Sequence, residues 1–176
     1  FGQNNLDVAE RIIEHVRAWV MDGARVAECY AGAGAIGLSL LSRVREIRMN
    51  EVNPSSLSGL ALGLAGLDPA DRARVEVVPG PAGEALRAAS GAEVVIADPP
   101  RKGLDRGVLE HLAGHPPERF VYVSCGLESF IEDTTRLTAG GKLRLAGLTA
   151  FNLMPFTEHV ETVACFERAR SLSTGR

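Results

Sequence analysis

The sequence contains little cysteine, no long apolar run and no surplus of positive charge. Three cysteines in 176 residues, none spaced as C-x-x-C, provide no disulfide framework and favour a reducing, cytoplasmic setting. No apolar run approaches the roughly 18–20 residues of a membrane-spanning helix, so we expect no membrane partner. The formal net charge of −3 is unusual for a stand-alone nucleic-acid-binding domain, because phosphate contacts supply much of the affinity of such domains. We assign no metal ligands.

The rest of the composition, 45% hydrophobic and 23% charged residues, is typical of a soluble globular protein. At this length the chain can form one domain with a sizeable core. We predict that residues 1–170 form that domain and that residues 171–176 form a flexible tail. The chain begins with Phe1, directly before helix-like sequence, so we expect it to be part of a longer protein.

Strand-like and helix-like segments alternate along most of the chain. The apolar patterns predict strands at residues 25–30, 46–51, 74–78, 92–97, 119–124, 142–150 and 160–168. They predict helices at residues 5–21, 36–42, 54–67, 83–89, 108–113 and 127–138. This alternation indicates an α/β fold with a mostly parallel sheet. The last two strands have no helix between them, which predicts an antiparallel strand near the C-terminus.

A glycine-rich turn follows the first predicted strand. Gly32, Gly34 and Gly37 match the pattern G-x-G-x-x-G, in which glycines let the backbone approach a ligand and expose N–H groups at the start of a helix. Glu51 ends the next strand, where a carboxylate can bind the two ribose hydroxyls of a nucleoside. The alternative for Glu51 is a solvated loop acid. The pattern predicts a nucleoside cofactor and suits both NAD and S-adenosylmethionine.

Two residues before the turn distinguish these cofactors. A strand that leads into a dinucleotide site is usually apolar up to the first glycine, whereas this strand contains Glu28 and Tyr30. A carboxylate at Glu28 suits the cationic amino-acid end of S-adenosylmethionine better than an anionic pyrophosphate. We therefore favour S-adenosylmethionine.

Cys125 follows the predicted strand 119–124 and lies directly before a predicted helix. The carboxyl ends of neighbouring parallel strands face one crevice, so Cys125 is expected near Asp98, which also follows a strand. A helix N-terminus lowers the pKa of a thiol below its free value of about 8.5, which predicts an available thiolate at Cys125. A structural role for this cysteine remains open on spacing alone. Cys29 and Cys165, each flanked by strand residues, are interpreted as small buried hydrophobic residues.

Five segments, in order, resemble the RNA uracil-5-methyltransferase family. They are FGQN at residues 1–4, YAGAG at 30–34, DPPRKG at 98–103, YVSC at 122–125 and PFTEHVETV at 155–163. The resemblance covers nearly the whole chain and corresponds to the C-terminal catalytic domain of that family. It implies a Rossmann-like class I methyltransferase fold with a seven-stranded sheet. It also implies that the N-terminal RNA-binding region of the parent protein is absent, which would account for the missing basic surplus.

The resemblance implies methyl transfer from S-adenosylmethionine to C5 of a uridine in tRNA or rRNA. C5 of uracil is a poor nucleophile, so a thiolate first adds at C6, C5 then attacks the methyl group, and a base finally removes the C5 proton. Cys125 matches the nucleophile and Glu161 the general base. Asp98 matches a carboxylate that contacts the target base and lies near the cofactor.

The resemblance also assigns cofactor-binding positions. Gln3, Tyr30 and Glu51 match residues that bind S-adenosylmethionine in the family, and Gly32 and Gly34 form the floor of that site.

The segments around the catalytic positions contain further candidates. Arg101 and Lys102 follow Asp98 on a loop and are candidates for binding RNA phosphates, with a solvated basic loop as the alternative. Glu158 and His159 lie near the proposed base, but neither is our choice for a catalytic role. After the nucleophile the family often has Asn-Pro, whereas this chain has Gly126-Leu127.

Three other interpretations remain at this stage. The sequence Asp-Pro-Pro resembles the signature of amino-methyltransferases, but these have an aromatic residue next, where this chain has Arg101. A dinucleotide-dependent oxidoreductase would leave Cys125 together with Glu161 unexplained. A non-enzymatic RNA-binding or scaffold domain could retain the fold without the activity, although it would not need a thiol and a base.

Overall fold

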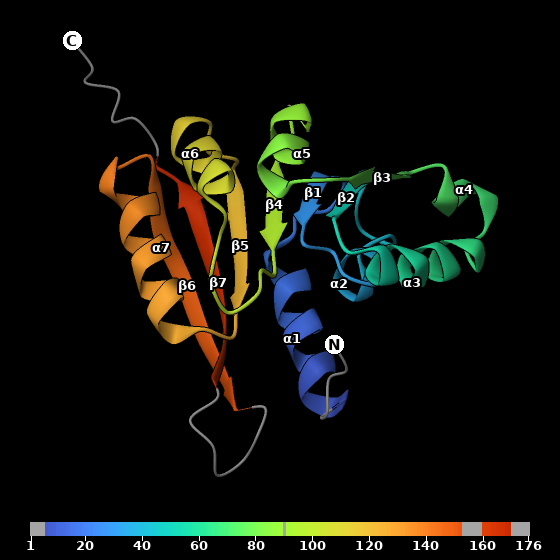
Figure 1. Cartoon of the computed structure of the whole chain (residues 1–176), viewed down its shortest axis with the longest axis horizontal. Helices are drawn as coiled ribbons and strands as arrows, with labels where there is room; N and C mark the ends of the chain where they lie inside the picture. Colours follow the sequence, from blue (N-terminus) through green and yellow to red (C-terminus); the bar gives the residue numbers. More distant parts are fainter. Residues whose placement is uncertain (1–5, 90, 153–159, 170–176) are drawn as a thin grey trace.

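The computed structural model describes residues 6–89, 91–152 and 160–169, which form a seven-stranded sheet covered by helices (Figure 1). The strands are β1 (Arg25–Cys29), β2 (Glu46–Glu51), β3 (Val75–Pro79), β4 (Val94–Ala97), β5 (Arg119–Ser124), β6 (Leu143–Asn152) and β7 (Val160–Arg168). The helices are α1 (Leu6–Trp19), α2 (Ala35–Ser39), α3 (Pro54–Ala65), α4 (Pro69–Arg72), α5 (Ala82–Ala88), α6 (Arg106–Gly114) and α7 (Leu127–Ala139). Among these helices, none is long and apolar enough to cross a membrane.

The sheet has the strand order β3-β2-β1-β4-β5-β7-β6. Strands β1 to β5 pair in parallel, and β7 runs antiparallel to both β5 and β6. The predicted α/β class, the mostly parallel seven-stranded sheet and the antiparallel strand near the C-terminus are therefore confirmed. Strand β1 lies between β2 and β4, so the order of strands reverses there, and open α/β sheets bind ligands at such a switch point.

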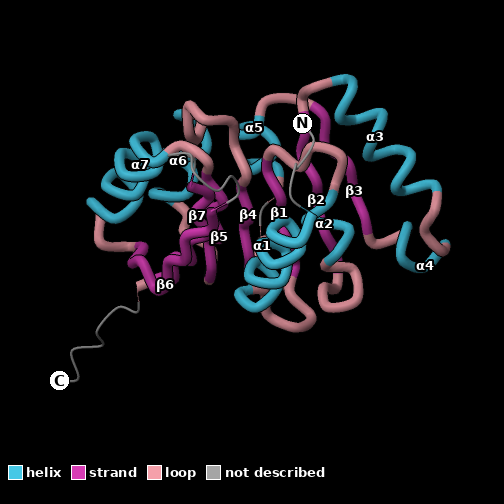
Figure 2. Tube along the Cα trace, turned by 90° about the horizontal axis from the view of Figure 1, so that it is seen from below, coloured by secondary structure: helices cyan, strands magenta, loops and turns pink. Residues whose placement is uncertain are grey.

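Two hydrophobic layers cover the sheet, one on each face. Because successive side chains of a strand point to opposite faces, Val95 belongs to one layer and Ile96 to the other. One layer contains residues of α1, α2 and α3, and the other contains residues of α5, α6 and α7. Figure 2 shows α1 and α2 on one side of the sheet and α6 and α7 on the other. Cys29 and Cys165 are buried within strands, which confirms their interpretation as small hydrophobic residues.

Candidate active site

The predicted catalytic residues lie together at the carboxyl edge of the parallel strands. Asp98 follows β4 and Cys125 follows β5, which are neighbours in the sheet. Strand β7 runs antiparallel to β5, so its beginning lies at the end of β5, where Thr162 pairs with Ser124. Cys125 directly follows Ser124, and Glu161 directly precedes Thr162, so both residues lie at this end of the β5–β7 pair. The fold thus places a thiol and two carboxyl groups around one point.

Every acidic group in this cluster holds its proton more tightly than usual. Burial, together with the nearby charge of Glu161, raises the pKa of Asp98 to about 7. Burial also raises the pKa of Glu161, whose side chain is only 7% exposed. A carboxyl pKa close to neutral is suited to proton transfer, because the group can both accept and release a proton at working pH.

The expectation of an activated thiolate at Cys125 is wrong for this structure. The thiol pKa is raised, first by partial burial, then by the charges of Glu161 and Asp98, and only Arg101 and a local backbone hydrogen bond oppose the shift. Cys125 lies one residue before Gly126, the N-cap of α7, so a helix N-terminus is indeed close. Two negative carboxylates and partial desolvation outweigh its effect. The thiol therefore keeps its proton at neutral pH until a neighbouring group accepts it.

The loop that carries Asp98 is held against α7 by side chains that the sequence analysis did not identify. Asp133 is 5% exposed, and its Oδ2 accepts hydrogen bonds from the Leu104 N–H at 2.8 Å and from the Tyr122 hydroxyl at 2.7 Å. Gly103 has φ +83°, and a Cβ there would lie 2.5 Å from the same oxygen. The loop can lie on Asp133 only because this position has no side chain.

A second close approach fixes the same loop beside the thiol. A Cβ at Gly126 would lie 2.5 Å from the Arg101 carbonyl oxygen and 2.7 Å from Ser129 Oγ. Ser129 Oγ itself donates to that carbonyl oxygen at 2.8 Å. With the loop in this conformation, position 126 has no room for the asparagine that resembling sequences often contain.

Glu51 fastens the glycine turn to the end of β2. Its Oε2 accepts from the Gly32 N–H at 2.8 Å, and its Oε1 accepts from the N–H groups of Val52 and Asn53, each at 2.7 Å. The side chain is buried, so the alternative of a solvated loop acid is wrong. A carboxylate has about four acceptor positions, and three are occupied here. A ribose whose two hydroxyls both donate to Glu51 must displace one of these backbone donors.

Tyr30 connects the glycine turn to the loop before α6. It has φ +60°, which is rare for a bulky residue and is typical of strained, functional positions. Its hydroxyl donates to Asp105 Oδ2 at 3.1 Å and accepts from the Asp105 N–H at 3.0 Å. Asp105 is the N-cap of α6, and its other oxygen pairs with Lys102 Nζ at 3.2 Å. An aspartate directly before a helix was a recognisable N-cap signal, but its partner Tyr30 is remote in sequence.

The remaining predicted residues differ in how they are placed. Arg101 and Lys102 are both exposed, and Arg101 forms no ion pair with any residue that the structure describes. Gln3, Glu158 and His159 lie outside the described residues. The glycine turn itself is present, with positive φ at Gly32 and Gly34.

Glu28 is a buried carboxyl group beneath the glycine turn. Its Oε1 accepts from the Gly37 N–H at 3.2 Å, whereas its Oε2 has no hydrogen-bond partner among the described residues. Burial raises the pKa of Glu28 to about 8. An unpaired buried carboxyl oxygen is costly, and a ligand that brings donors or positive charge would relieve that cost.

Comparison with known proteins places the chain in a family. A model of the tRNA (uracil-5-)-methyltransferase family matches residues 87–169, which include Asp98, Cys125 and Glu161. An uncharacterized RNA methyltransferase of Protochlamydia amoebophila is 37% identical over 168 residues, covering 96% of this chain and 44% of the relative. A second, of Lactococcus lactis, is 34% identical and covers 96% of this chain and 37% of the relative. The chain belongs to the RNA (uracil-5-)-methyltransferase family.

Solved structures agree with membership of the uracil-5-methyltransferase family. The tRNA (uracil-54, C5)-methyltransferase of Pyrococcus abyssi, in complex with S-adenosyl-L-homocysteine, is 26% identical with a TM-score of 0.78. The similarity covers 94% of this chain and 40% of that one. The M1A22 tRNA methyltransferase of B. subtilis, at 10% identity and a TM-score of 0.69, covers 90% of this chain and 66% of its own and shares the fold. The chain thus spans less than half the length of the curated relatives it matches.

Proposed function

We propose that this chain is the catalytic part of an enzyme that transfers a methyl group from S-adenosylmethionine to C5 of a uridine in tRNA or rRNA. The observation that carries the proposal is the grouping of Cys125, Asp98 and Glu161 at the carboxyl edge of the sheet. This grouping lies next to the switch point at β1, where the glycine turn begins. Family membership and the similarity to a uracil methyltransferase of solved structure support it.

The residues around the glycine turn fit S-adenosylmethionine. Gly32 has open space where a Cβ would lie, so a ligand can approach its backbone closely. The unpaired Oε2 of Glu28 suits a donor-bearing cationic group, and Glu51 lies at the position expected for ribose. Tyr30 borders the same turn, and the similar Pyrococcus abyssi enzyme was solved with S-adenosyl-L-homocysteine. When bound, the cofactor supplies an electrophilic methyl group on a sulfonium.

Cys125 and Glu161 supply nucleophile and base in this proposal. The Cys125 sulfur forms a bond to C6 of uracil, which moves electron density to C5 and lets C5 take the methyl group. Glu161 then accepts the proton from C5, the C6–S bond breaks, and the thiolate leaves. Because the free thiol is protonated at neutral pH, Asp98 accepts its proton as the attack begins, which leaves the Glu161 carboxylate free to accept the C5 proton.

Asp98 is suited to hold the pyrimidine ring. Its pKa of about 7 gives it both protonation states near neutral pH. The protonated carboxyl donates to a ring carbonyl, whereas the ionised form accepts from a ring N–H. The Leu104 N–H donates to Asp133, and Ser129 Oγ donates to the Arg101 carbonyl oxygen. These hydrogen bonds hold the loop, so the Asp98 carboxyl group is in place before the ring arrives.

Covalent trapping tests the proposal directly. The protein is incubated with S-adenosylmethionine and RNA that contains 5-fluorouridine, and the products are separated on a denaturing gel. Fluorine at C5 cannot leave as a proton, so the adduct should persist as a slower band. Cys125→Ala should remove that band, whereas Cys165→Ala, which deletes a buried thiol, should retain it. An adduct in Cys125→Ala would refute the assigned nucleophile, and its absence in both this chain and a longer parent would refute the covalent route.

A further inference from the structure

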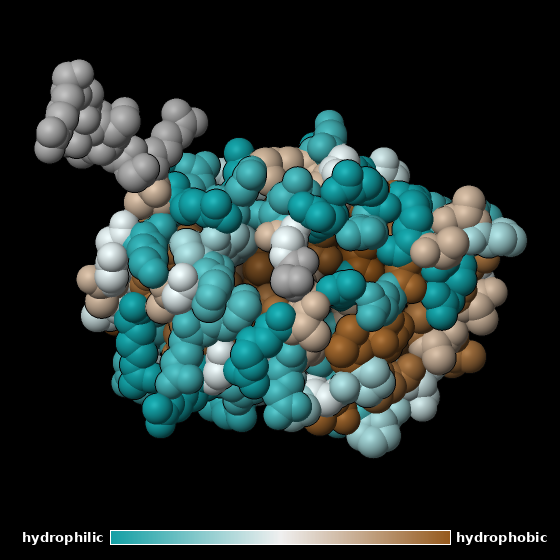
Figure 3. Space-filling view, turned by 90° about the horizontal axis from the view of Figure 1, so that it is seen from above, coloured by the Kyte–Doolittle hydropathy of each residue, from teal (hydrophilic) through white to brown (hydrophobic). Residues whose placement is uncertain are grey.

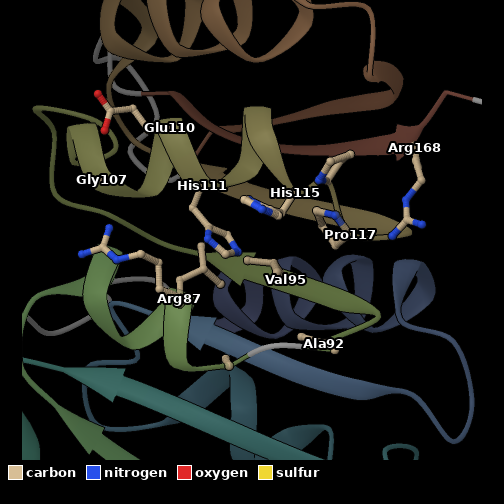
Figure 4. Close-up of a pocket in the computed structure, with 13 residues that line it drawn as sticks. Arg87, Ala92, Val95, Gly107, Glu110, His111, His115, Pro117 and Arg168 are labelled. Atoms are coloured by element: carbon tan, nitrogen blue, oxygen red, sulfur yellow. The ribbon is translucent and has the colours of Figure 1, made fainter.

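A cleft of about 870 Å³ lies at the opposite edge of the sheet from Cys125. It opens between α5 and α6, and Val95 at the beginning of β4 lines it, whereas Asp98 follows the end of that strand. Figure 4 shows its lining residues coming from α5, α6 and the end of β7. The cleft is therefore separate from the active site.

Basic and imidazole side chains surround this cleft. They are Arg87 of α5, His111 of α6, His115 at the C-cap of α6, and Arg168 at the end of β7. Within the described ranges, neither arginine side chain has a hydrogen-bond or ion-pair partner. The acidic residue of the lining, Glu110, is paired with Arg106 at 2.7 Å. The positive groups are thus left without an acidic partner in the cleft.

Two imidazole rings accompany the arginines in this cleft. Their rings stack with centroids 5.1 Å apart and an interplanar angle of 25°. Burial lowers the pKa of His111, and the charges of His115 and Arg87 lower it further. The lowered pKa keeps His111 uncharged at neutral pH, so its imidazole can donate an N–H hydrogen bond to an anion.

The floor of the cleft is apolar. Leu86 and Val95 are 2% and 3% exposed, and Pro117 borders them. Figure 3 looks onto this end of the molecule and shows apolar areas among hydrophilic side chains. The volume lies within the range of roughly 300–1,000 Å³ that is usual for small-molecule sites. A fitting ligand therefore combines an anionic group with a flat, weakly polar body.

We propose that this cleft binds a nucleotide, with its phosphate on Arg87 and the two imidazoles and its base over Leu86 and Val95. A guanidinium without a partner is well suited to phosphate, because it presents several N–H donors in a fixed plane. The nucleotide comes either from an RNA strand or from free mononucleotide, which share this chemistry. Binding at the cleft does not require methyl transfer, so it can be tested independently of the active site.

Histidine NMR measures occupancy of the cleft. The chain has four histidines, and two of them line the cleft. Uridine 5′-monophosphate, uridine and a short oligouridylate are titrated separately, without methyl donor, while the imidazole C–H signals are followed. The nucleotide and the oligomer should shift the signals of His111 and His115, and uridine should shift them much less. His15 is the internal reference, because its ring bonds to Thr149 on another part of the fold.

A pair of arginine variants tests the assigned phosphate contact. Arg87→Gln should weaken binding of the monophosphate about tenfold, since a charged hydrogen bond is lost. Arg45→Gln is the matched control, because Arg45 is exposed at the same edge of the sheet but does not line this cleft. Equal affinity in Arg87→Gln and the wild type would overturn the proposal, as would unshifted signals of His111 and His115 or equal shifts by uridine.

The same titration, together with the kinetics of Arg87→Gln, distinguishes an RNA strand from a free mononucleotide as the source of the bound nucleotide. If RNA is the occupant, the oligomer binds more tightly than the monophosphate, and Arg87→Gln raises KM for RNA with kcat unchanged. If a free mononucleotide is the occupant, the monophosphate binds at least as tightly as the oligomer, and KM for RNA does not change.

Discussion

Replacing Asp133 with alanine should destabilise the protein and displace the loop that carries Asp98. The carboxylate is buried, and a single oxygen accepts from both the Leu104 N–H and the Tyr122 hydroxyl. Both donors belong to buried residues, with exposures of 7% for Leu104 and 0% for Tyr122. Alanine would leave both buried donors without the acceptor that they share.

The number of hydrogen bonds that each variant loses sets the expected loss of unfolding free energy. Each unsatisfied buried donor costs about 1–3 kcal/mol, so Asp133→Ala, which leaves two of them, should lower the free energy of unfolding by about 2–6 kcal/mol. Asp133→Asn keeps an acceptor oxygen but loses its charge, and should cost about 1–2 kcal/mol. Tyr122→Phe leaves the Leu104 N–H paired and should cost about 1 kcal/mol. Glu132→Ala, on the exposed face of the same helix, should change stability by less than about 0.5 kcal/mol.

Urea unfolding at neutral pH measures these differences. The urea concentration at the unfolding midpoint should be highest for Glu132→Ala, lower for Tyr122→Phe and lowest for Asp133→Ala. The slope of the unfolding free energy against urea concentration should not change. For a chain of this size, about 4 kcal/mol corresponds to a fall in Tm of roughly 8–16 °C. Methylation rate should fall in Asp133→Asn as well, because the loop around Asp98 is less firmly held.

Two results would refute this reasoning. If Asp133→Ala unfolds within about 0.5 kcal/mol of the wild type, the two buried donors do not depend on this carboxylate. If Tyr122→Phe costs as much as Asp133→Ala, the Leu104 N–H contributes nothing and the loop is held by other contacts.

Three further predictions concern Glu161, Glu28 and Gly126. Glu161→Gln should let the RNA adduct accumulate on a denaturing gel, because the C5 proton is retained; a variant that never forms adduct would contradict this role. Burial raises the pKa of Glu28 from 4.5 to about 8, so between these values the folded state binds more protons than the unfolded state. Stability should therefore fall as pH rises from about 5 to 8, by at most about 5 kcal/mol, and urea unfolding of Glu28→Gln should show a shallower fall; equal slopes would contradict it. Gly126→Ala, whose Cβ would lie 2.5 Å from the Arg101 carbonyl oxygen, should cost about 1–3 kcal/mol and change the alkylation rate of Cys125; two unchanged values would show that the loop yields freely.

The sheet could be predicted from the sequence because its central strands are buried on both faces. Strand β4 is VVIA and β5 is FVYVS, runs that are typical of buried parallel strands. The strand order could not be predicted, since the insertion of β7 between β5 and β6 depends on pairing between distant segments. The four-residue helix α4 was missed as well, although Asp68 before Pro69 is a recognisable N-cap signal.

The grouping of Asp98 with Cys125 followed from their positions at strand ends, and Glu161 was added only by the family resemblance. The proton affinities of these three residues could not be predicted in this way. The pKa of Cys125 depends on burial and on Glu161, which approaches only because β7 pairs with β5. Asp105 and Asp133 were missed for the same reason, since their partners Tyr30 and Tyr122 come from other elements. Local patterns show which residues end a strand, but not which charges will surround them.

The antiparallel pairing of β5 with β7 makes the distance between Cys125 and Glu161, the proposed nucleophile and base, insensitive to the length of the connection that leads into β7. Adjacent strands lie about 4.8 Å apart whatever chain joins them, so the ladder ending at Ser124 and Thr162 sets the spacing. A slip of the register by one residue would turn Glu161 to the opposite face of the sheet. We therefore expect insertions outside the ladder to leave the spacing between Cys125 and Glu161 unchanged, whereas a shift within the ladder would separate the two side chains.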